Sequence, residues 1–483
     1  MDYEVERSWA AKPLFYRAPH PPQVTPREYQ HAGVEYHLAR DHAMFGDAPG
    51  VGKTAECILL SNAINARRTL VVCPASLRLN WEREIWAWST IPNVETYPIN
   101  AGRDGVSDRA HYVVISYDLL RNKSILAALL ALKWDHMILD EAHYLKDPHG
   151  NSRTRPIGAP DALPSVVGRI TMATGTPLPN QPVEAYNFAR LLNWDAIDRA
   201  SLASFREHYY DYGAGFVTRT KWVDGKRVTK TEWSKHVRNV PVRMDELQQR
   251  LRKHIMVRRL KEDVLPELPK RQWHMFPLAM TPAMKAAMQH PGWAKAEKLW
   301  EMDPAAFSSQ ILVDGHITTA RRLLGEAKAP AIAEYVIQLL REGVSKVVVG
   351  AWHISVLDIL REAFGKEKLA HVYMDGSTST TNKQRAVDMF QLDASVKIIL
   401  GQMQPLGKGW TLHAAQDVVL AEPYWVPGEN DQILDRTHRF GQTGDRVIGH
   451  IPVVPNSLDE RVMGVVIEKD KSIYLALDSE GSR

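Results

Sequence analysis

Short apolar runs alternate along this chain with longer amphipathic stretches, and the runs fall into two separate sets. Runs this short, apolar throughout and separated by helix-length segments, are typical of buried parallel strands in α/β layers. The expected strands of the first set are Thr69–Cys73, Tyr112–Ser116, His136–Asp140 and Arg169–Ala173. Those of the second set are Lys346–Gly350, Leu369–Tyr373, Val396–Leu400, Asp417–Ala421 and Val447–Ile451. The pattern therefore predicts an α/β fold with two parallel-sheet lobes.

The region between the two sets breaks this pattern. Leu202 to Leu260 is polar, basic and aromatic, and within it Phe216–Val223 and Lys226–Thr231 flank the dipeptide Asp224-Gly225. That dipeptide between two strand-like runs is typical of a β-hairpin on a type I′ turn. Helix-like segments follow around Asp245–Met256 and Pro282–Gln289. We expect an inserted helical region with a hairpin between the lobes.

These changes of pattern suggest five segments. The lead before Pro26 is proline-rich, with His20-Pro21-Pro22, and we expect it to be a tail or docking segment. The predicted segments are an N-terminal tail 1–25, a first lobe 26–196, an insertion with the basic hairpin and the end of the first lobe or linker 197–330, a second lobe 331–455 and a C-terminal brace helix 456–483.

Composition excludes several classes of protein. Apolar residues make up 45% of the 483 residues and charged residues 24%, which excludes a wholly disordered chain. Two cysteines are too few for a disulfide framework or a cysteine-rich zinc module and favour a reducing compartment. The longest apolar run, Ile125 to Leu132, is too short to span a bilayer, and the acidic N-terminus lacks a signal-peptide pattern. We expect a cytoplasmic or nucleoid-associated protein without membrane contact.

Positive charge is concentrated in one part of the chain. The formal net charge is only +4, but residues 197–272 contain 18 Lys and Arg against 10 Asp and Glu. Such a block is either the contact surface for a polyanion or an ordinary solvated helical surface. Charge alone leaves both interpretations open.

A glycine-rich segment, Asp47–Thr54, precedes a predicted helix at Ala55–Ala66. Such a loop at a helix start directs backbone N–H groups toward phosphates, and its Lys and Thr are suited to the β/γ-phosphates and Mg²⁺. The alternative is a tight turn between helix and loop. The residues expected to bind nucleotide are Gly50, Gly52, Lys53 and Thr54.

An acidic pair follows one of the predicted buried strands. Met137-Ile138-Leu139 is apolar and leads directly into Asp140 and Glu141. Chemistry in α/β sheets is placed at the carboxyl ends of strands. Asp140 is suited to complete the Mg²⁺ shell with Thr54, and Glu141 to orient or deprotonate the attacking water. An inert surface pair is the alternative.

Around these two sites, the order of further motifs resembles helicase superfamily II, specifically its SWI/SNF-type ATPases. The matching segments of the first lobe are Pro26–Gln30, Asp47–Thr54, Val72–Leu77 with Asn80–Glu82, Ile115–Tyr117, Asp140–His143, Thr174–Leu178 and Met256–Val264. Those of the second lobe are Val347–Trp352, Asp375–Ser377, Gly407–Leu412 and Gln432–Gln442. The resemblance extends from about Pro26 to Leu477 and implies two RecA-like lobes, with Gln30 reading the adenine.

Within that family the chain most resembles the HepA-related annealing-helicase branch. The carriers are Trp425–Gly428 and the stretch Leu77–Trp88. The chain departs from the family pattern at two places, which put the rate of the reaction in doubt more than the class of activity. One is Ala48-Pro49 in the glycine-rich loop, where Pro49 removes one backbone N–H, and the other is Leu406, where the family often has glycine.

The resemblance implies a DNA-dependent ATPase that uses ATP and Mg²⁺. Catalysis would combine Asp140 and Glu141 of the first lobe with Arg436 and Arg439 of the second. The two arginines lie one helical turn apart and so on one face. Arginine at a γ-phosphate stabilises charge in the transition state. A surface helix with salt bridges is the alternative for them.

The resemblance also implies duplex or forked DNA as the partner, with remodelling or annealing in replication, repair or recombination. Motif hydroxyls would contact phosphates, although a capping or turn role is equally open for each. An RNA-directed superfamily-II helicase and a catalytically inactive DNA-binding scaffold are the competing hypotheses. The candidate DNA contacts are the hydroxyls of Ser76, Ser116, Thr176 and Thr411 and the hairpin residues Arg219, Lys221, Lys226 and Arg227.

Overall fold

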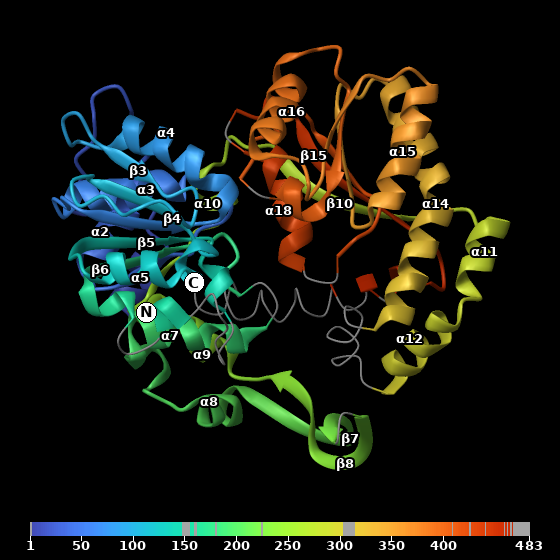
Figure 1. Cartoon of the computed structure of the whole chain (residues 1–483), viewed down its shortest axis with the longest axis horizontal. Coiled ribbons are helices and arrows are strands. Elements are labelled where there is room, and N and C mark those ends of the chain that lie inside the picture. The colour runs from blue at the N-terminus through green and yellow to red at the C-terminus, as the bar shows by residue number, and fades with distance from the viewer. Residues whose placement is uncertain are drawn as a thin grey trace.

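The computed structural model describes residues 2–146, 155–158, 162–178, 181–223, 226–302, 314–407, 409–424, 427–439, 441–457, 459–460, 462–463 and 466, with backbone only at 212–240, 299–302 and 427. Two lobes lie side by side, each built on a parallel sheet flanked by helices (Figure 1). The predicted α/β fold with two RecA-like lobes is confirmed.

The first lobe is a seven-stranded parallel sheet with strand order β3-β4-β2-β5-β6-β1-β9. All four strands predicted from the apolar runs are present, and β1, β3 and β9 were not predicted. The strands are β1 (Ala43–Phe45), β2 (Thr69–Cys73), β3 (Thr96–Pro98), β4 (Tyr112–Ser116), β5 (Trp134–Asp140), β6 (Val167–Ala173) and β9 (Met256–Val257). The helices around them include α2 (Glu28–Leu38), α3 (Lys53–Ala63), α4 (Arg78–Trp88), α5 (Lys123–Leu130), α7 (Ala185–Leu192) and α9 (Met244–His254).

The second lobe is a six-stranded parallel sheet with strand order β10-β15-β14-β11-β13-β12. Each of the five predicted runs forms a strand, within two residues of the predicted bounds. The strands are β10 (Lys270–Pro277), β11 (Val347–Ala351), β12 (His371–Met374), β13 (Ile398–Gln402), β14 (Asp417–Leu420) and β15 (Arg446–Val453). The helices include α14 (Gly315–Arg341), α15 (Ile354–Lys366), α16 (Thr380–Leu392), α17 (Met403–Gly407) and α18 (Pro427–Thr437).

The segment predicted as an insertion, 197–330, is divided between the lobes. Its strand β9 pairs with β1 in the first sheet, whereas β10 pairs with β15 along its whole length in the second. The chain thus passes from one sheet to the other between Val257 and Lys270, through α10 (Lys261–Val264). α11 (Pro282–Met288) and α12 (Pro291–Met302) lie beside α14 on the second lobe (Figure 1).

The hairpin within this segment projects away from both lobes at the bottom of Figure 1. It follows α8 (Leu202–Tyr209) and consists of the antiparallel strands β7 (Tyr210–Val223) and β8 (Lys226–Pro241). The predicted hairpin is therefore confirmed and is longer than expected. Its turn, Asp224-Gly225, and most of the predicted C-terminal brace, 456–483, lie outside the described residues.

The N-terminal segment packs on the first lobe. α1 (Tyr3–Arg7) is followed by Ser8, whose carbonyl accepts the N–H of Arg258 at 3.0 Å. Glu35 of α2 accepts the N–H groups of Leu14 and Phe15 at 2.8 and 2.9 Å. These contacts attach residues 2–25 to the lobe that carries the glycine-rich loop.

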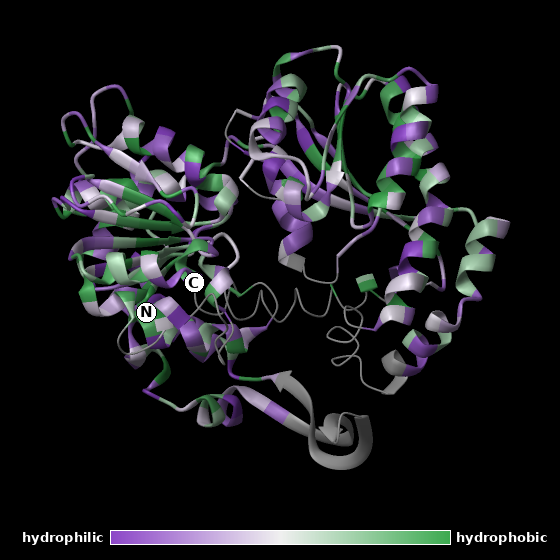
Figure 2. Cartoon of the chain, in the orientation of Figure 1, coloured by the Kyte–Doolittle hydropathy of each residue, from purple (hydrophilic) through white to green (hydrophobic). Residues whose placement is uncertain are grey.

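Each lobe has a hydrophobic core of its own. The two large clusters of buried apolar residues in the first lobe extend to Val257, and a small one adds Val264 and Leu265. The large cluster of the second lobe begins at Leu278. In Figure 2 the strands at the centre of each lobe are mostly hydrophobic, and hydrophilic colours gather on the outer faces of the helices. Two separate cores allow the lobes to move relative to one another. Within the described residues, no helix has the length and apolar character needed to cross a bilayer.

Candidate functional site

The glycine-rich loop lies between β1 and α3 and has the conformation that only glycine adopts easily. Gly50 and Gly52 have φ of +86° and +94°. The α2 helix holds the loop from behind: Tyr29 donates to the carbonyl of Val51 at 2.7 Å and Gln30 to that of Gly52 at 3.4 Å. A Cβ at position 52 would lie 2.7 Å from Nε2 of Gln30, so this close approach requires glycine.

Lys53 and Thr54 occupy the first turn of α3, at the helix terminus that favours anions. The ammonium of Lys53 donates to the loop carbonyls of Asp47 and Ala48 at 2.8 and 3.0 Å. Burial lowers the pKa of Lys53, although nearby carboxylates, Glu141 foremost, oppose that shift. The predicted phosphate-binding lysine is thus folded over the loop.

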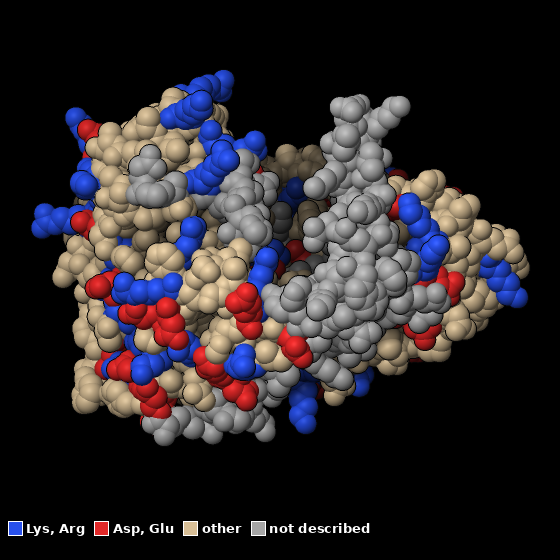
Figure 3. Space-filling view, turned by 90° about the horizontal axis from the view of Figure 1, so that it is seen from below, with Lys and Arg blue, Asp and Glu red and all other residues tan. Residues whose placement is uncertain are grey.

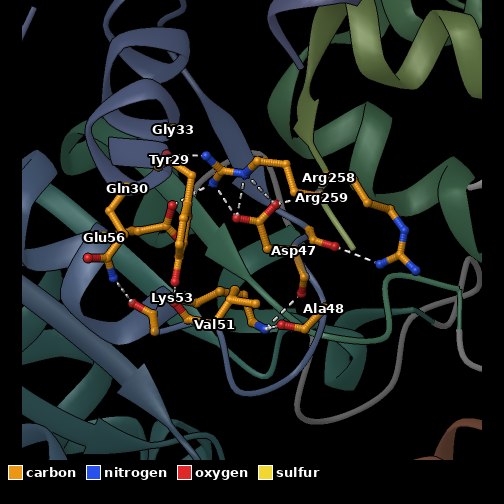
Figure 4. A network of polar contacts seen from close by, with 12 residues as sticks. Tyr29, Gln30, Gly33, Asp47, Ala48, Val51, Lys53, Glu56, Arg258 and Arg259 are labelled. Atoms are coloured by element: carbon orange, nitrogen blue, oxygen red, sulfur yellow. Dashed lines mark hydrogen bonds and ion pairs between the residues drawn. The ribbon is translucent and has the colours of Figure 1, made fainter. Parts of the chain in front are cut away.

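A buried ion cluster fixes the start of the loop (Figure 4). The side chain of Arg259 is fully buried between Asp47 and Glu56, and its Nη2 lies 2.6 Å from Glu56 Oε1. Arg259 also donates its backbone N–H to Asp47 Oδ1 at 2.7 Å. A Cβ at Gly33 would lie 2.7 Å from Glu56 Oε1, so α2 also needs glycine at this contact. Asp47 therefore anchors the loop to the chain after β9 and is not directed toward the phosphate position.

Asp140 and Glu141 lie at the carboxyl end of β5, as predicted. Burial and the adjacent Glu141 charge raise the pKa of Asp140. Burial also opposes ionisation of Glu141, but a hydrogen bond from His143 and the charges of Arg436 and Lys53 outweigh it and lower its pKa. Glu141 adopts φ of +50°, a left-handed conformation that turns its side chain away from the strand direction. The Lys53 and Arg436 charges converge on these carboxylates from opposite lobes.

Trp81 holds Asp140 from a second helix. Its indole Nε1 donates to Asp140 Oδ2 at 2.8 Å, and the Glu141 N–H donates to Asp140 Oδ1 at 2.9 Å. Trp81 lies on α4 and is 1% exposed. Both oxygens of Asp140 are thereby oriented, which is how outer contacts usually fix a metal-binding carboxylate. This role of Trp81 was not predicted from the sequence, although a buried tryptophan normally needs an acceptor for its N–H.

Arg436 and Arg439 extend from the second lobe toward the first. Arg436, at the end of α18, is 4% exposed and donates to the carbonyl of Gly407 at 2.8 Å. Burial lowers its pKa, while the Glu141, Asp435 and Asp140 charges oppose that shift. Arg439 lies over the glycine-rich loop, because a Cβ placed on Gly50 would be 3.1 Å from Cγ of Arg439. Both arginines therefore lie at the first-lobe site.

A polar cluster, which we call the interlobe clasp, joins α10 to α18 and consists of the buried Lys261, Asp435 and His438 together with the exposed Arg271. Lys261 donates to Asp435 Oδ1 and to the carbonyl of His438, each at 2.6 Å. Arg271 reaches Asp435 at 3.2 Å, and His438 Nε2 donates to the carbonyl of Pro269 at 2.7 Å. The clasp holds the end of α18, which carries Arg436. Arg439 lies just after the last residue of this helix, Thr437, so the expected shared helical face is not formed.

The donor set fits a nucleoside triphosphate with Mg²⁺. The residues that would hold the phosphates are the loop N–H groups and Lys53, with the two arginines facing them, and those that would hold Mg²⁺ are Thr54 and Asp140. Among the residues that the structure describes, no three His, Cys, Asp or Glu side chains cluster as a protein-only metal site. Mg²⁺ commonly binds through one or two carboxylates together with phosphate oxygens and water, which suits this arrangement.

Two adjoining cavities open between the lobes. The larger has a volume of about 780 Å³ and the smaller about 330 Å³, and they share Ser76, Leu77, Thr380 and Trp410. Leu77 of the first lobe, which lines both cavities, lies so close to Gly409 of the second that a Cβ there would require the Leu77 side chain to move, and the φ of +74° at Gly409 also favours glycine. The cavities are thus enclosed by motif segments of both lobes.

The four predicted DNA-contacting hydroxyls differ in position. Ser76 lines both cavities, and its Oγ is buried without a hydrogen-bond partner among the described residues. Ser116 is 2% exposed and accepts the Leu119 N–H at 3.4 Å, a contact of the kind that the alternative turn role would give it. Thr176 accepts a 3.5 Å contact from Gln432 across the lobes. Thr411 is half-buried beside Trp410, which lines the cavities.

The predicted basic contacts of the hairpin lie on β7 and β8, where the structure describes only the backbone. Trp222 is paired with Arg227 and Val223 with Lys226 in the strand register, at the end of the hairpin far from the lobes. Arg219 and Lys221 lie farther along β7. In Figure 3, Lys and Arg side chains of the described surface lie side by side with Asp and Glu over much of the first lobe.

Two family models match consecutive parts of the chain. Residues 29–328 match the SNF2-related domain and residues 330–441 the helicase conserved C-terminal domain. A similar curated protein is the "SWI/SNF-related matrix-associated actin-dependent regulator of chromatin subfamily A-like protein 1" of Xenopus laevis, 29% identical over 94% of this chain and 44% of that protein. The human "DNA annealing helicase and endonuclease ZRANB3" is 29% identical over 91% of this chain and 39% of that protein.

Among solved structures, the "Sulfolobus solfataricus SWI2/SNF2 ATPase core in complex with dsDNA" is 20% identical, with a TM-score of 0.41, and the match covers 97% of this chain and 96% of that one. The chain spans less than half the length of the two curated relatives named above. The SNF2-related model matches more than half of this chain. The chain therefore belongs to the SNF2-related family and contains both lobes of its helicase-type ATPase core.

Proposed function

We propose that this chain hydrolyses ATP in order to translocate on duplex or forked DNA, and that it remodels or anneals DNA in replication, repair or recombination. The observation that carries the proposal is the position of Arg436 and Arg439, which reach the glycine-rich loop and Glu141 from the other lobe. A nucleotide bound at Lys53 would therefore contact both lobes, and its hydrolysis would change the forces between them.

The chemical step uses the residues in separate roles. Bound ATP with Mg²⁺ supplies the reactive phosphoryl group and part of its charge neutralisation. Lys53 and the loop N–H groups bind the phosphates, Glu141 orients the attacking water and accepts its proton, and Arg436 stabilises charge that develops on the transferred phosphoryl group. The low pKa of Glu141 keeps this carboxylate ionised and able to accept a hydrogen bond from water.

DNA is the proposed partner because the two cavities between the lobes are lined by the motif segments that face each other there. Ser76 on one side and Thr380 on the other line the smaller cavity and offer hydroxyls to a backbone there, and such contacts carry no sequence information. The curated relatives named above include a DNA annealing helicase, which supports the remodelling role. An association with cellular DNA in the cytoplasm or nucleoid follows from this proposal.

The test is ATP turnover with no nucleic acid and with single-stranded DNA, duplex DNA, forked DNA and duplex RNA. We expect duplex or forked DNA to stimulate turnover most. Equal or greater stimulation by RNA would favour the RNA-directed alternative, and no turnover with any of them would favour an inactive scaffold.

Translocation is distinguished from strand separation by the product. Moving along an intact duplex needs only phosphate contacts, whereas separation must also unstack bases at about 1.4 kcal/mol per base-pair step. We expect rewinding or fork remodelling, because the hairpin is the only wedge that we identify in the described part of the chain. Efficient release of single strands from a short labelled duplex would contradict this expectation and make the hairpin a separation pin.

The hairpin has its own test. Neutral substitutions at the four basic positions should weaken duplex binding and reduce its salt dependence, because each lost phosphate contact changes the log–log slope by about 0.9. An unchanged slope would make the hairpin an ordinary solvated surface. The substitutions are Arg219→Gln, Lys221→Gln, Lys226→Gln and Arg227→Gln.

A further inference from the structure

The larger cavity between the lobes has aromatic walls. On the first lobe Tyr144 stacks on Tyr117, with ring centroids 5.3 Å apart and planes within 8°. On the second lobe Trp352 stacks on Tyr424 at 4.6 Å and 19°. Tyr144 and Trp352 both line the cavity and are half-buried, so each presents a ring that is supported from behind.

The charges around this cavity do not suit a polyanion. Its acidic lining side chains outnumber its basic ones, and Lys146 is already paired with Glu184 at 3.4 Å. The cavity therefore offers a phosphate backbone no excess of cations, whereas an uncharged base needs none. The charged side chains that line the cavity are Asp118, Glu141, Glu429, Lys146 and Lys383.

The adjoining smaller cavity has the opposite character. It is lined by Arg83 of α4 and Arg385 of α16, with one acidic residue, Asp388, and by the amides of Asn80 and Gln384. Such groups suit phosphate and sugar. Because the two cavities adjoin and share lining residues such as Ser76 and Thr380, a nucleotide could place its backbone in the smaller one and its base in the larger one.

We propose that Tyr144 and Trp352 form a stacking site for an unpaired base of DNA, so that the cleft recognises the single-stranded part of a fork. This proposal rests on the proposed function and names the feature of the DNA that the same cleft recognises. Stacking between base and aromatic ring is independent of sequence, since every base has a π face. A paired base cannot enter, because both of its faces are covered within the duplex.

The site also contacts the nucleotide-binding residues. Tyr117, on which Tyr144 stacks, donates its hydroxyl to the backbone carbonyl of Asp140 at 2.8 Å. His143 stacks on Tyr144 at 5.2 Å and lies 3.3 Å from Glu141. A base stacked on Tyr144 would therefore bear on groups in contact with both carboxylates, and forked DNA should stimulate turnover more than duplex DNA.

The experiment uses 2-aminopurine at the first unpaired position of a forked DNA, because stacking on an aromatic ring quenches its fluorescence. The full chain should quench the probe in the fork, and Tyr144→Leu or Trp352→Leu should each abolish quenching and weaken fork binding about 5- to 150-fold. Trp352→Phe keeps a stacking ring and should retain most of the quenching. Thermal unfolding of each variant identifies any that does not fold.

Trp86→Leu is the matched control, because Trp86 is 54% exposed on α4 and lies outside the lining of both cavities. It should bind the fork as the unaltered chain does. Quenching that survives in both Tyr144→Leu and Trp352→Leu would overturn the stacking site. If duplex DNA stimulates turnover but the probe is never quenched, the stacking site alone is wrong. If duplex and forked DNA stimulate no turnover, the proposed function fails.

Discussion

Replacing Lys261 by methionine should disconnect the two lobes while leaving each of them folded. Lys261 and Asp435 are 5% and 3% exposed at the side chain, and their charged atoms lie 2.6 Å apart. Removing one partner of a buried ion pair costs about 3–5 kcal/mol, because the other charge stays buried. Arg271 still reaches Asp435 at 3.2 Å in the variant, so we expect the lower end of that range.

The loss should act on the contact between the lobes, because the pair joins α10 to α18. About 3 kcal/mol corresponds to a reduction of roughly 100-fold in the closed arrangement relative to the open one. Turnover at saturating ATP should fall by up to about 100-fold, since Arg436 and Arg439 are then seldom over the loop. Nucleotide binding to the first lobe should change little, because Lys53 and the loop are intact.

The assay compares turnover, binding of a fluorescent ATP analogue and thermal unfolding for Lys261→Met, Lys261→Arg and the control Arg341→Met. Arg341 pairs with Glu367 at 2.8 Å on the surface of the second lobe, where such a pair contributes about 0–1 kcal/mol. Of these variants, only Lys261→Met should lose turnover severely. Adding Asp435→Asn to Lys261→Met should lower turnover much less than Asp435→Asn does alone. Normal turnover in Lys261→Met would refute the role of the clasp.

Arg436→Ala and Arg439→Ala should each lower turnover, Arg436→Ala by about 10³- to 10⁵-fold, with nucleotide binding retained; normal DNA-stimulated turnover in the double variant would eliminate the two-lobe mechanism. Trp81→Phe removes the N–H that orients Asp140 but keeps a ring, so a Mg²⁺ titration of turnover should shift about 10- to 100-fold upward, and an unshifted titration would deny Trp81 this role. Burial lowers the pKa of His136 to about 3, below the usual value near 6.5. The unfolded chain then binds the proton more tightly, so stability should fall as the pH drops from about 6.5 toward 3, by about 1.4 kcal/mol per pH unit from this group. His136→Asn should remove that part of the slope in denaturant unfolding measured across this pH range, and an unchanged slope would show that His136 titrates normally.

Much of the sheet architecture could be predicted because buried parallel strands need continuous apolar runs. The strands that escaped prediction are too short or too polar to form such runs: β1 has three residues, and β10 carries Trp273 and Met275 on an exposed surface. β10 belongs to the second sheet through its pairing with β15, which is a long-range contact that no local pattern reports.

Some residues of the candidate site could likewise be predicted from local sequence patterns, and others could not. Lys53 lies in one short motif and Asp140 and Glu141 in another, and the sequence shows the local pattern of each motif. Trp81 and Lys261 reach the site from distant segments, and their roles depend on tertiary packing. A signal did exist for Lys261, since a basic run directly after the apolar Met256-Val257 implies that buried cations will need acidic partners.

The most direct test of the account is duplex-stimulated ATP turnover by the unaltered chain and by Glu141→Gln, measured together with nucleotide binding. Glu141→Gln keeps the shape of the side chain but removes the group that accepts the proton of the attacking water. We expect turnover that rises with duplex DNA in the unaltered chain, and a variant that binds ATP yet shows almost no turnover. Near-normal turnover in Glu141→Gln, or turnover in the unaltered chain that ignores DNA, would contradict the account.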